Sequence, residues 1–392
     1  MHITHLSLAG ARSFRRLELP LTPGLHVVTG QNGSGKSNLL EGIALLATTR
    51  SLRIANDLEL IAWDALRDDP LPAARYAARV HTAVDDNITI EVIVSARPAT
   101  PGIEANAASR RFRVNGVARR ASDLIGRLRV VLFSADDLGI IDGAPTARRR
   151  YLDITLSQLD PAYVRALQRY QRVLQQRNSL LRRLQERRGQ PGELDFWDEE
   201  LAQTGAMLIT SRAHAIATLN TDAAQRYAAL STGSAPLEVC YRPALPPPLI
   251  ETVASSTTSL APKLLEALVV GRTRDIQAGT TRIGPHRDDV AFLIGGHPAG
   301  STASRGELRG IALTLRLAEV AFSTARTGDP PVLLLDDVLS ELDAGRRARV
   351  LAAAFEVDQV IITSPDPDRP APAELSAASR YRIDAGVLEP IG

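Results

Sequence analysis

The sequence predicts an α/β protein with an all-helical lobe inserted into it, and three observations carry this prediction. A glycine-rich loop stands between a strand and a helix near residue 30, and an apolar strand ending in two aspartates stands near residue 335. Helical periodicity fills much of the chain between them. The 392 residues allow two or three domains. We predict an N-terminal part (1–140), a helical lobe (141–270) and a C-terminal part (271–392).

The N-terminal part alternates between strands and a helix. Apolar and alternating patterns predict strands over 3–8, 17–21 and 25–29, a helix over 38–47, strands within 75–95 and 111–117, and a loop at 96–109.

From residue 145 the pattern becomes helical. A first apolar stripe ends at the Gly- and Pro-containing break 189–192, and a second long helix is predicted over 194–230. The stretch 231–262 is rich in Pro, Ser and Thr and predicts an irregular connection. Beyond it we predict a helix over 263–278, strands, a further helix, an apolar strand over 332–335 and another over 360–362.

Composition places the chain among globular proteins, since 44% of the residues are hydrophobic and 23% are charged. No apolar run is long enough to span a membrane, and the first residues lack the pattern of a secretory signal. The single cysteine, Cys240, excludes an internal disulfide framework and a zinc site built from several thiolates. We therefore expect a cytoplasmic protein without a membrane partner.

Basic residues are unevenly distributed along the chain. The net charge is only +2, yet residues 145–190 hold eleven arginines against three acidic residues, a local charge of +8. Such a stretch favours a docking face for a polyanion such as DNA, although the same arginines could form a solvated face over the core. The candidate DNA-binding residues are Arg148, Arg149, Arg165, Arg169 and Arg172.

The glycine-rich loop has the spacing G-x-x-x-x-G-K-[ST] of a phosphate-binding loop. Glycines let successive backbone N–H groups face one concavity, and the following helix adds its positive N-terminal end. Lys36, one of only two lysines, can reach the β- and γ-phosphates and is a candidate catalytic residue, while Ser37 can bind Mg²⁺. The candidate nucleotide-binding residues are Gly30, Gln31, Asn32, Gly33, Ser34, Gly35, Lys36 and Ser37.

The apolar strand over 332–335 ends in Asp336 and Asp337. A buried parallel strand reads as a continuous apolar run, and ligands gather at the carboxyl ends of such strands. Asp336 therefore suits Mg²⁺, and Asp337 suits a catalytic base that polarises the attacking water.

A third segment, Ser304-Arg-Gly-Glu307, precedes an apolar-periodic helix. One interpretation is a capping box, with serine as the N-cap and glutamate three residues later. The other is that this helix start faces a phosphate, with Ser304 and the amide of Gly306 as donors. Spacing leaves both interpretations open.

Together these segments resemble the head of ABC-type ATPases, with Walker A at 30–37, the signature at 304–307, Walker B at 332–337 and a D-loop at 340–343. The chain further resembles the RecF family of bacterial DNA replication and repair proteins over nearly its whole length. The segments that carry this resemblance are 8–14, 32–41, 143–153, 284–288 and 335–343.

The resemblance implies a mixed sheet, ATP and Mg²⁺ as cofactors, and weak, DNA-dependent ATPase activity. It implies an ATP-dependent homodimer in which the signature of one subunit completes the site of the other. It also implies binding to junctions of single- and double-stranded DNA, and work with RecR and RecO in loading RecA at gaps. Arg12 joins the nucleotide-binding candidates through this resemblance.

The chain departs from the ABC pattern at several positions. Asp337 is shorter than the glutamate of transporters, Glu307 replaces a glutamine, and Thr363 replaces the switch histidine. These changes fit a slow ATPase. The alternative is an ABC-type ATPase subunit serving another machine, in transport or chromosome organisation. The segment Gly284-Pro285-His286-Arg287 has no derivable chemistry, and His286 either lies near the nucleotide or caps a turn.

Overall fold

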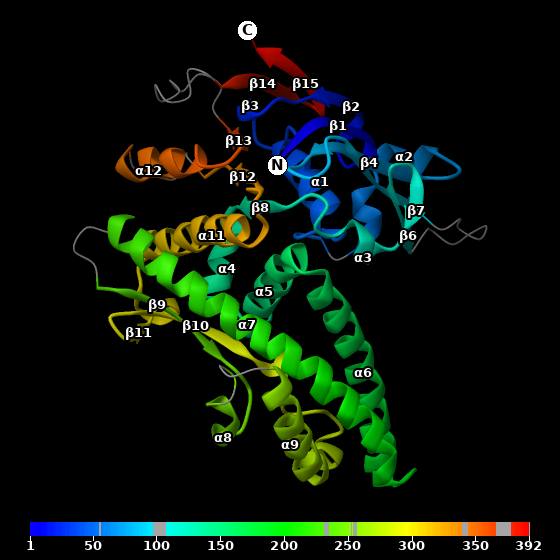
Figure 1. Ribbon diagram of the computed structural model, residues 1–392. Coiled ribbons are helices and arrows are strands. Elements are labelled where there is room, and N and C mark those ends of the chain that lie inside the picture. The colour runs from blue at the N-terminus through cyan, green and yellow to red at the C-terminus, as the bar shows by residue number, and fades with distance from the viewer. Residues whose placement is uncertain are drawn as a thin grey trace. The chain divides into compact units, whose positions relative to one another are not determined.

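The computed structural model describes residues 1–54, 56–96, 107–230, 235–251, 253, 257–338, 344–365 and 378–391. Its contacts divide the chain into two compact units (Figure 1). Unit 1 comprises Met1–Asp137 and Glu319–Gly392, and unit 2 comprises Leu138–Ala318. Unit 2 thus extends from residue 138 to residue 318, and the predicted division of the chain at residues 140 and 270 stays a prediction.

Unit 1 contains an antiparallel sheet with the strand order β2-β1-β4-β5-β6-β7. Alternation of apolar and polar residues predicts such strands, and in β5 the side chains of Ile88, Ile90, Val92 and Val94 are all buried. The strands are β1 (His2–Ala11), β2 (Phe14–Pro20), β4 (Ala73–His81), β5 (Ile88–Ala96), β6 (Ala108–Val114) and β7 (Val117–Arg119).

The second sheet of unit 1 has the order β15-β14-β3-β13-β12-β8. Its pairs are parallel except for β14 with β15, so the sheet is mixed, as the resemblance implied. The strands are β3 (Gly24–Thr29), β8 (Val130–Phe133), β12 (Val332–Asp336), β13 (Gln359–Ser364), β14 (Ser379–Asp384) and β15 (Val387–Ile391).

Helix α1 (Lys36–Thr48) shares one hydrophobic core with both sheets of unit 1. Leu39, Leu40 and Ile43 on α1 are buried in this core together with Leu8 of β1 and Leu334 of β12. The helix start is therefore fixed at the carboxyl ends of β3 and β12. The remaining helical segments of unit 1 are η1 (Asp57–Leu60), α2 (Trp63–Asp68), α3 (Ala121–Leu124), η2 (Ala135–Asp137) and α12 (Ala344–Ala354).

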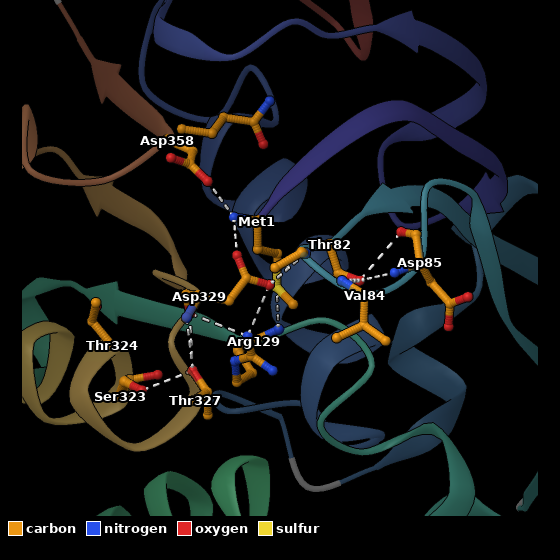
Figure 2. Close-up of polar contacts among 12 residues, drawn as sticks. Met1, Thr82, Val84, Asp85, Arg129, Ser323, Thr324, Thr327, Asp329 and Asp358 are labelled. Atoms are coloured by element: carbon orange, nitrogen blue, oxygen red, sulfur yellow. Dashed lines mark hydrogen bonds and ion pairs between the residues drawn. The ribbon is translucent and has the colours of Figure 1, made fainter.

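An ion cluster anchors the start of β1 (Figure 2). The ammonium of Met1 lies 2.5 Å from Asp329 Oδ1 and also pairs with Asp358. Asp329 in turn accepts a hydrogen bond from Arg129 Nη2 at 3.2 Å and one from the backbone N–H of Ala83, also at 3.2 Å. The cluster thus ties β1 to the segments that lead into β12 and β13.

Unit 2 is dominated by long helices, as predicted. Helix α6 is capped by Asp160, whose carboxylate accepts the N–H of Ala162 at 2.7 Å, and Pro161 stands at its first position. The helical segments are α4 (Leu138–Ile141), α5 (Pro145–Leu159), α6 (Pro161–Gln185), η3 (Pro191–Leu194), α7 (Asp195–Leu230), α8 (Pro247–Ile250), α9 (Thr257–Ala278), η4 (Pro285–Arg287) and α10 (Ala299–Thr302). Helix α11 (Arg305–Thr327) begins in unit 2, and its residues from Glu319 onward belong to unit 1.

Unit 2 differs from the predicted all-helical lobe because it also contains a three-stranded sheet with the order β11-β10-β9. Strand β9 (Leu237–Arg242) falls in the stretch predicted to be irregular, and it pairs antiparallel with β10 (Asp289–Ile294). Strand β11 (His297–Pro298) completes the sheet. None of the helices that the structure describes is long and apolar enough to cross a membrane.

Candidate functional site

The phosphate-binding loop connects β3 to α1 with the geometry that its glycines allow. Gly33 and Gly35 have φ angles of 85° and 113°, in the left-handed region that disfavours other residues. A Cβ at Gly30 would lie 2.3 Å from the carbonyl oxygen of Ile383, so the backbone passes too close for a side chain. No side chain caps α1, and its first turn holds no acidic residue. The positive end of the helix is therefore open to an anion.

Lys36 folds back over the loop that carries it. Its Nζ donates hydrogen bonds to the carbonyl oxygens of Gly30 at 2.6 Å and Gln31 at 2.8 Å. Burial lowers the pKa of Lys36, whereas the carboxylates of Asp337 and Asp336 oppose this change. Lys36 thus holds its ammonium group where it would meet a phosphate bound by the loop.

Asp336, at the end of β12, is the centre of the site. Its Oδ1 accepts hydrogen bonds from Ser37 Oγ at 3.1 Å and from Thr363 Oγ1 at 2.7 Å. Its Oδ2 accepts a hydrogen bond from Arg53 Nη2 at 2.7 Å. The approach of Ser37 to Asp336 follows from the parallel pairing of β12 with β13 and of β13 with β3.

Arg53 is the member of this site that no sequence pattern predicts, whereas Thr363 was expected only as the residue at the switch position. Arg53 lies in the segment after α1 and also donates from Nε to Asp136 at 3.1 Å. Ser51 accepts the backbone N–H of Arg53 at 3.1 Å and donates to the buried carboxylate of Glu41. Because arginine is the default basic residue of this chain, nothing in its local sequence marks Arg53.

Asp337 follows β12 in a left-handed conformation, with a φ angle of 56°. Its backbone N–H donates to Thr363 Oγ1 at 3.0 Å. A non-glycine residue in this region is uncommon and is held here by its neighbours. The turn directs the chain away from the sheet directly after Asp336.

Arg12, in the β1–β2 turn, lies beside the first turn of α1. Its Nε donates to Asn38 Oδ1 at 3.3 Å, and its Nη1 donates to the carbonyl of Glu59 at 3.1 Å. Nε is also 3.6 Å from the carboxylate of Glu41. The structure thus places Arg12 against the helix that begins at the phosphate-binding loop.

The predicted signature segment lies in unit 2 and forms the capping box. The backbone N–H and Oγ of Ser304 both donate to Glu307 Oε2 at 2.8 Å, and the N–H of Glu307 donates to Ser304 Oγ at 3.3 Å. Ser304 is exposed, and Gly306 is half-buried. Contact of Ser304 and Gly306 with a phosphate stays a prediction. The predicted D-loop, 340–343, lies outside the described residues.

The predicted DNA-binding arginines of unit 2 fall into two groups. Arg148 makes two hydrogen bonds to Asp289, at 2.6 and 3.1 Å, and Arg149 donates to the carbonyl of Asp288 at 2.7 Å. Arg165, Arg169 and Arg172 are exposed on α6. Of these, Arg169 pairs with Glu200, and Arg172 donates from Nε to the carbonyl of Gln168 at 3.2 Å.

The segment 284–288 builds a buried polar network in unit 2. His286 Nε2 donates to the carbonyl of Thr281 at 3.0 Å, so in the neutral ring Nδ1 accepts from the hydroxyl of Tyr170 at 2.6 Å. Burial lowers the pKa of His286 to about 4. Asp288, also buried, accepts from Arg212 Nη1 at 3.2 Å. The segment therefore joins α6 to α7 through Tyr170 and Arg212, and a place for His286 near the nucleotide stays untested.

The residues of unit 1 fit a magnesium nucleotide. The hydroxyl of Ser34 is buried in the loop without a hydrogen-bond partner among the residues that the structure describes. The hydroxyl of Ser37 and the carboxylate of Asp336 are oxygen ligands of the kind that Mg²⁺ prefers. The loop offers backbone N–H groups, an ammonium and a helix start to the phosphates.

Comparison with known proteins identifies the family of the chain. A RecF/RecN/SMC N-terminal domain family model matches residues 2–374. "DNA replication and repair protein RecF" of Chloroflexus aurantiacus is 44% identical over 392 residues, covering 98% of this chain and 99% of that protein. The RecF of Roseiflexus castenholzii is 43% identical over 397 residues, covering 100% of both chains.

Solved structures agree with the sequence relatives. A structure of the recombination mediator protein RecF with ATP, from the RecFOR pathway, is 28% identical with a TM-score of 0.85 and covers 100% of this chain and 98% of its own. An Smc head domain, 16% identical with a TM-score of 0.52, shares the fold. The chain belongs to the RecF family of DNA replication and repair proteins, whose ATPase fold explains the site around Asp336.

Proposed function

We propose that this protein is an ATP-driven DNA-binding switch of recombinational repair and replication-fork maintenance in the cytoplasm. The observation that carries the proposal is the hydrogen bond between Ser37 of the phosphate-binding loop and Asp336 of Walker B. This hydrogen bond brings a hydroxyl and a carboxylate, two kinds of Mg²⁺ ligand, together beside the ammonium of Lys36. Full-length similarity to RecF proteins supports the repair context.

In this proposal, ATP binds with its phosphates in the loop 30–37 and beside Arg12. Magnesium, held by Ser37 and Asp336, would neutralise phosphate charge when bound. Lys36 adds a second positive charge, and the carboxylate of Asp337 takes the proton from the attacking water. Hydrolysis is slow because aspartate is a short base and Thr363 stands where other ABC-type heads have histidine.

ATP also controls assembly in this proposal. Two copies associate head to tail, and Ser304 and Gly306 of each copy complete the nucleotide site of the other. The exposed position of Ser304 at the start of α11 supports this role. The dimer binds junctions of single- and double-stranded DNA, and together with RecR and RecO it helps to load RecA at gaps. DNA stimulates the weak ATPase activity.

The test combines two measurements on the parental chain. Size-exclusion chromatography with light scattering, with and without ATP and Mg²⁺, should show a shift from monomer to dimer that needs both. Fluorescence anisotropy with labelled duplex, single-stranded and gapped DNA should show ATP-dependent binding that is tightest for the gapped substrate. A chain that stays monomeric and binds no DNA with ATP present would contradict the proposal.

A further inference from the structure

The antiparallel sheet of unit 1 has two unlike faces. One face packs on α1 with apolar side chains such as Leu8, Tyr76 and Val92, which the register places in one line. The alternate residues of β1, β2, β4, β5 and β6 point the other way. We call this second side the outer face. Among its described residues it exposes no Phe, Tyr or Trp, because Phe14, which alternates with Arg16 on β2, is fully buried in the core.

Three arginines of the outer face lie in one row across the sheet. Ala9 of β1 pairs with Arg16 of β2 and Arg75 of β4, and Ile93 of β5 pairs with Arg75 and with Arg111 of β6. Because neighbouring strands are about 4.8 Å apart, the arginines are spaced by roughly 10 Å and the row spans roughly 19 Å.

The next positions along the strands add positive charge. Arg79 of β4 and Arg113 of β6 also belong to the outer face, and both are exposed. The acidic residues of this face on β1, β2, β4, β5 and β6 are Glu18 and Glu91. Five arginines against two glutamates leave a net charge of +3 on the outer face, before any charge on His5.

The glutamates are already engaged with neighbours on the same face. Glu91 pairs with Arg75 and lies 3.6 Å from Arg113, while Glu18 accepts hydrogen bonds from His5 Nε2 at 2.8 Å and Ser7 Oγ at 3.0 Å. For Arg79 and Arg111, by contrast, the described part of the chain provides no side-chain hydrogen bond or ion pair. Arg16 Nε lies 3.9 Å from the carboxylate of Glu18, and its side chain is 81% exposed.

The sheet keeps these charges apart. Like charges directly opposite each other on adjacent strands destabilise a sheet. Here the cross-strand neighbours of Arg16, Arg75 and Arg111 within the row are Ala9 and Ile93, which are neutral. Ser7, Ala9 and Ala77 are small, so a rigid, rod-shaped partner can approach the arginines closely.

We propose that the outer face of this sheet binds the sugar-phosphate backbone of duplex DNA, an inference that rests on the proposed function and names the surface that serves it. Guanidinium groups bind phosphate oxygens in a bidentate manner. A row of roughly 19 Å matches about five to six base pairs at 3.4 Å each. Without exposed Phe, Tyr or Trp side chains the face lacks the main platforms on which unpaired bases stack, which favours duplex over single strands. Backbone contacts of this kind do not distinguish sequences.

The experiment compares two triple variants with equal loss of charge. The sheet variant is Arg16→Gln/Arg79→Gln/Arg111→Gln, which leaves the pairs of Glu91 intact. The comparison variant on α6, at three of the other candidate DNA-binding arginines, is Arg165→Gln/Arg169→Gln/Arg172→Gln. Each is titrated with a duplex of about 20 base pairs at several salt concentrations with ATP and Mg²⁺ present. Thermal unfolding and ATP binding verify that both variants fold.

The sheet variant should lower the slope of log affinity against log salt by up to about 2.7, since each lost phosphate contact removes roughly 0.9. The α6 variant should keep a larger slope than the sheet variant. A sheet variant with the parental slope and affinity would overturn the proposal. DNA would then bind on α6 or on another surface, and the outer face would serve another partner, such as an acidic protein. If the parental chain itself binds no duplex, the proposed function fails, which is a distinguishable result.

Discussion

Arg53 and Asp336 are separated by 283 residues in the sequence, yet their side chains form an ion pair with Nη2 and Oδ2 2.7 Å apart. The carboxylate of Asp336 is 5% exposed, and the guanidinium of Arg53 is 28% exposed. The pair therefore links the segment after α1 to the end of β12 and is partly buried from solvent. Arg53 binds Oδ2 of Asp336, whereas Ser37 donates its hydrogen bond to Oδ1.

Replacement of Arg53 by alanine should destabilise unit 1 by about 1–3 kcal/mol, because it leaves the carboxylate of Asp336 without its cation. Urea unfolding without nucleotide measures this change. Arg50→Ala, which removes an exposed arginine three residues earlier, is the control and should cost under about 0.5 kcal/mol. Equal stability of the two variants would show that the Arg53–Asp336 pair contributes nothing net.

Removal of the ammonium of Lys36 should weaken ATP binding. The Lys36→Ala variant loses a charge-assisted contact of about 1.5–3 kcal/mol, which corresponds to roughly 10- to 100-fold in Kd. A fluorescent ATP analogue reports the affinity. Lys263→Ala removes the only other lysine, which is exposed on α9, and should bind ATP as the parental chain does. Unchanged affinity in Lys36→Ala would remove Lys36 from the site.

The carboxylate of Asp337 should matter for hydrolysis and little for binding. Asp337→Asn should slow ATP turnover by roughly 10²–10⁴-fold if this group is the general base, while the Kd for ATP stays close to the parental value. Phosphate release under single-turnover conditions separates the two effects. Turnover at the parental rate would exclude the catalytic role.

The signature segment can be tested through assembly. Ser304→Arg places a bulky cation where we propose that the phosphate of a partner copy binds, so ATP-dependent dimers should be lost while the monomer still binds ATP. Ser301→Arg, at another exposed serine near the start of α11, should dimerise normally. Light scattering gives the answer, and intact dimers of the Ser304 variant would leave Ser304 with its capping role alone.

The stability of unit 2 should depend on pH through His286. Its pKa is about 4 in the folded chain because burial disfavours the charged ring, against about 6.5 for an unfolded histidine. Unfolded chains therefore bind more protons between these values, and stability should be full above about pH 6.5 and fall as the pH drops toward 4. The loss should be at most about 3 kcal/mol, since each pKa unit is worth 1.36 kcal/mol.

Unfolding of a Trp63→Phe background, in which Trp197 reports on unit 2, measures this dependence. His286→Gln should flatten the stability profile between pH 4 and 6.5. His214→Gln, at an exposed histidine of α7, should keep the parental slope. If the His286 variant and the parental chain have the same slope, another group titrates in this range.

The sequence predicts those parts of the site whose functional residues are neighbours in the chain. The phosphate-binding loop and the two aspartates after β12 have a spacing that only a few structures use, and parallel pairing then brings Ser37 to Asp336. Arg53 could not be predicted, because its role depends on a contact across 283 residues and on a segment without periodicity.

The same limit explains the small sheet of unit 2. Strand β9 has six residues between proline-rich segments, and its pairing partner β10 begins at Asp289. Local pattern alone reads such a stretch as irregular, whereas the tertiary pairing makes it a strand. Likewise, the spacing of the signature segment was compatible with a capping box or a phosphate contact, and only the side-chain contacts of Ser304 reveal the box.

The strand order β14-β3-β13-β12-β8 has a consequence for biosynthesis. Strand β3 leaves the ribosome early, but its neighbours β13 and β14 are translated more than 300 residues later. The nascent chain therefore holds the loop 30–37 beside an unfilled sheet edge while all of unit 2 emerges, and domains generally fold as units in the order of translation. The contacts of Asp336 with Ser37 and Thr363 therefore form only after the last third of the polypeptide has been translated.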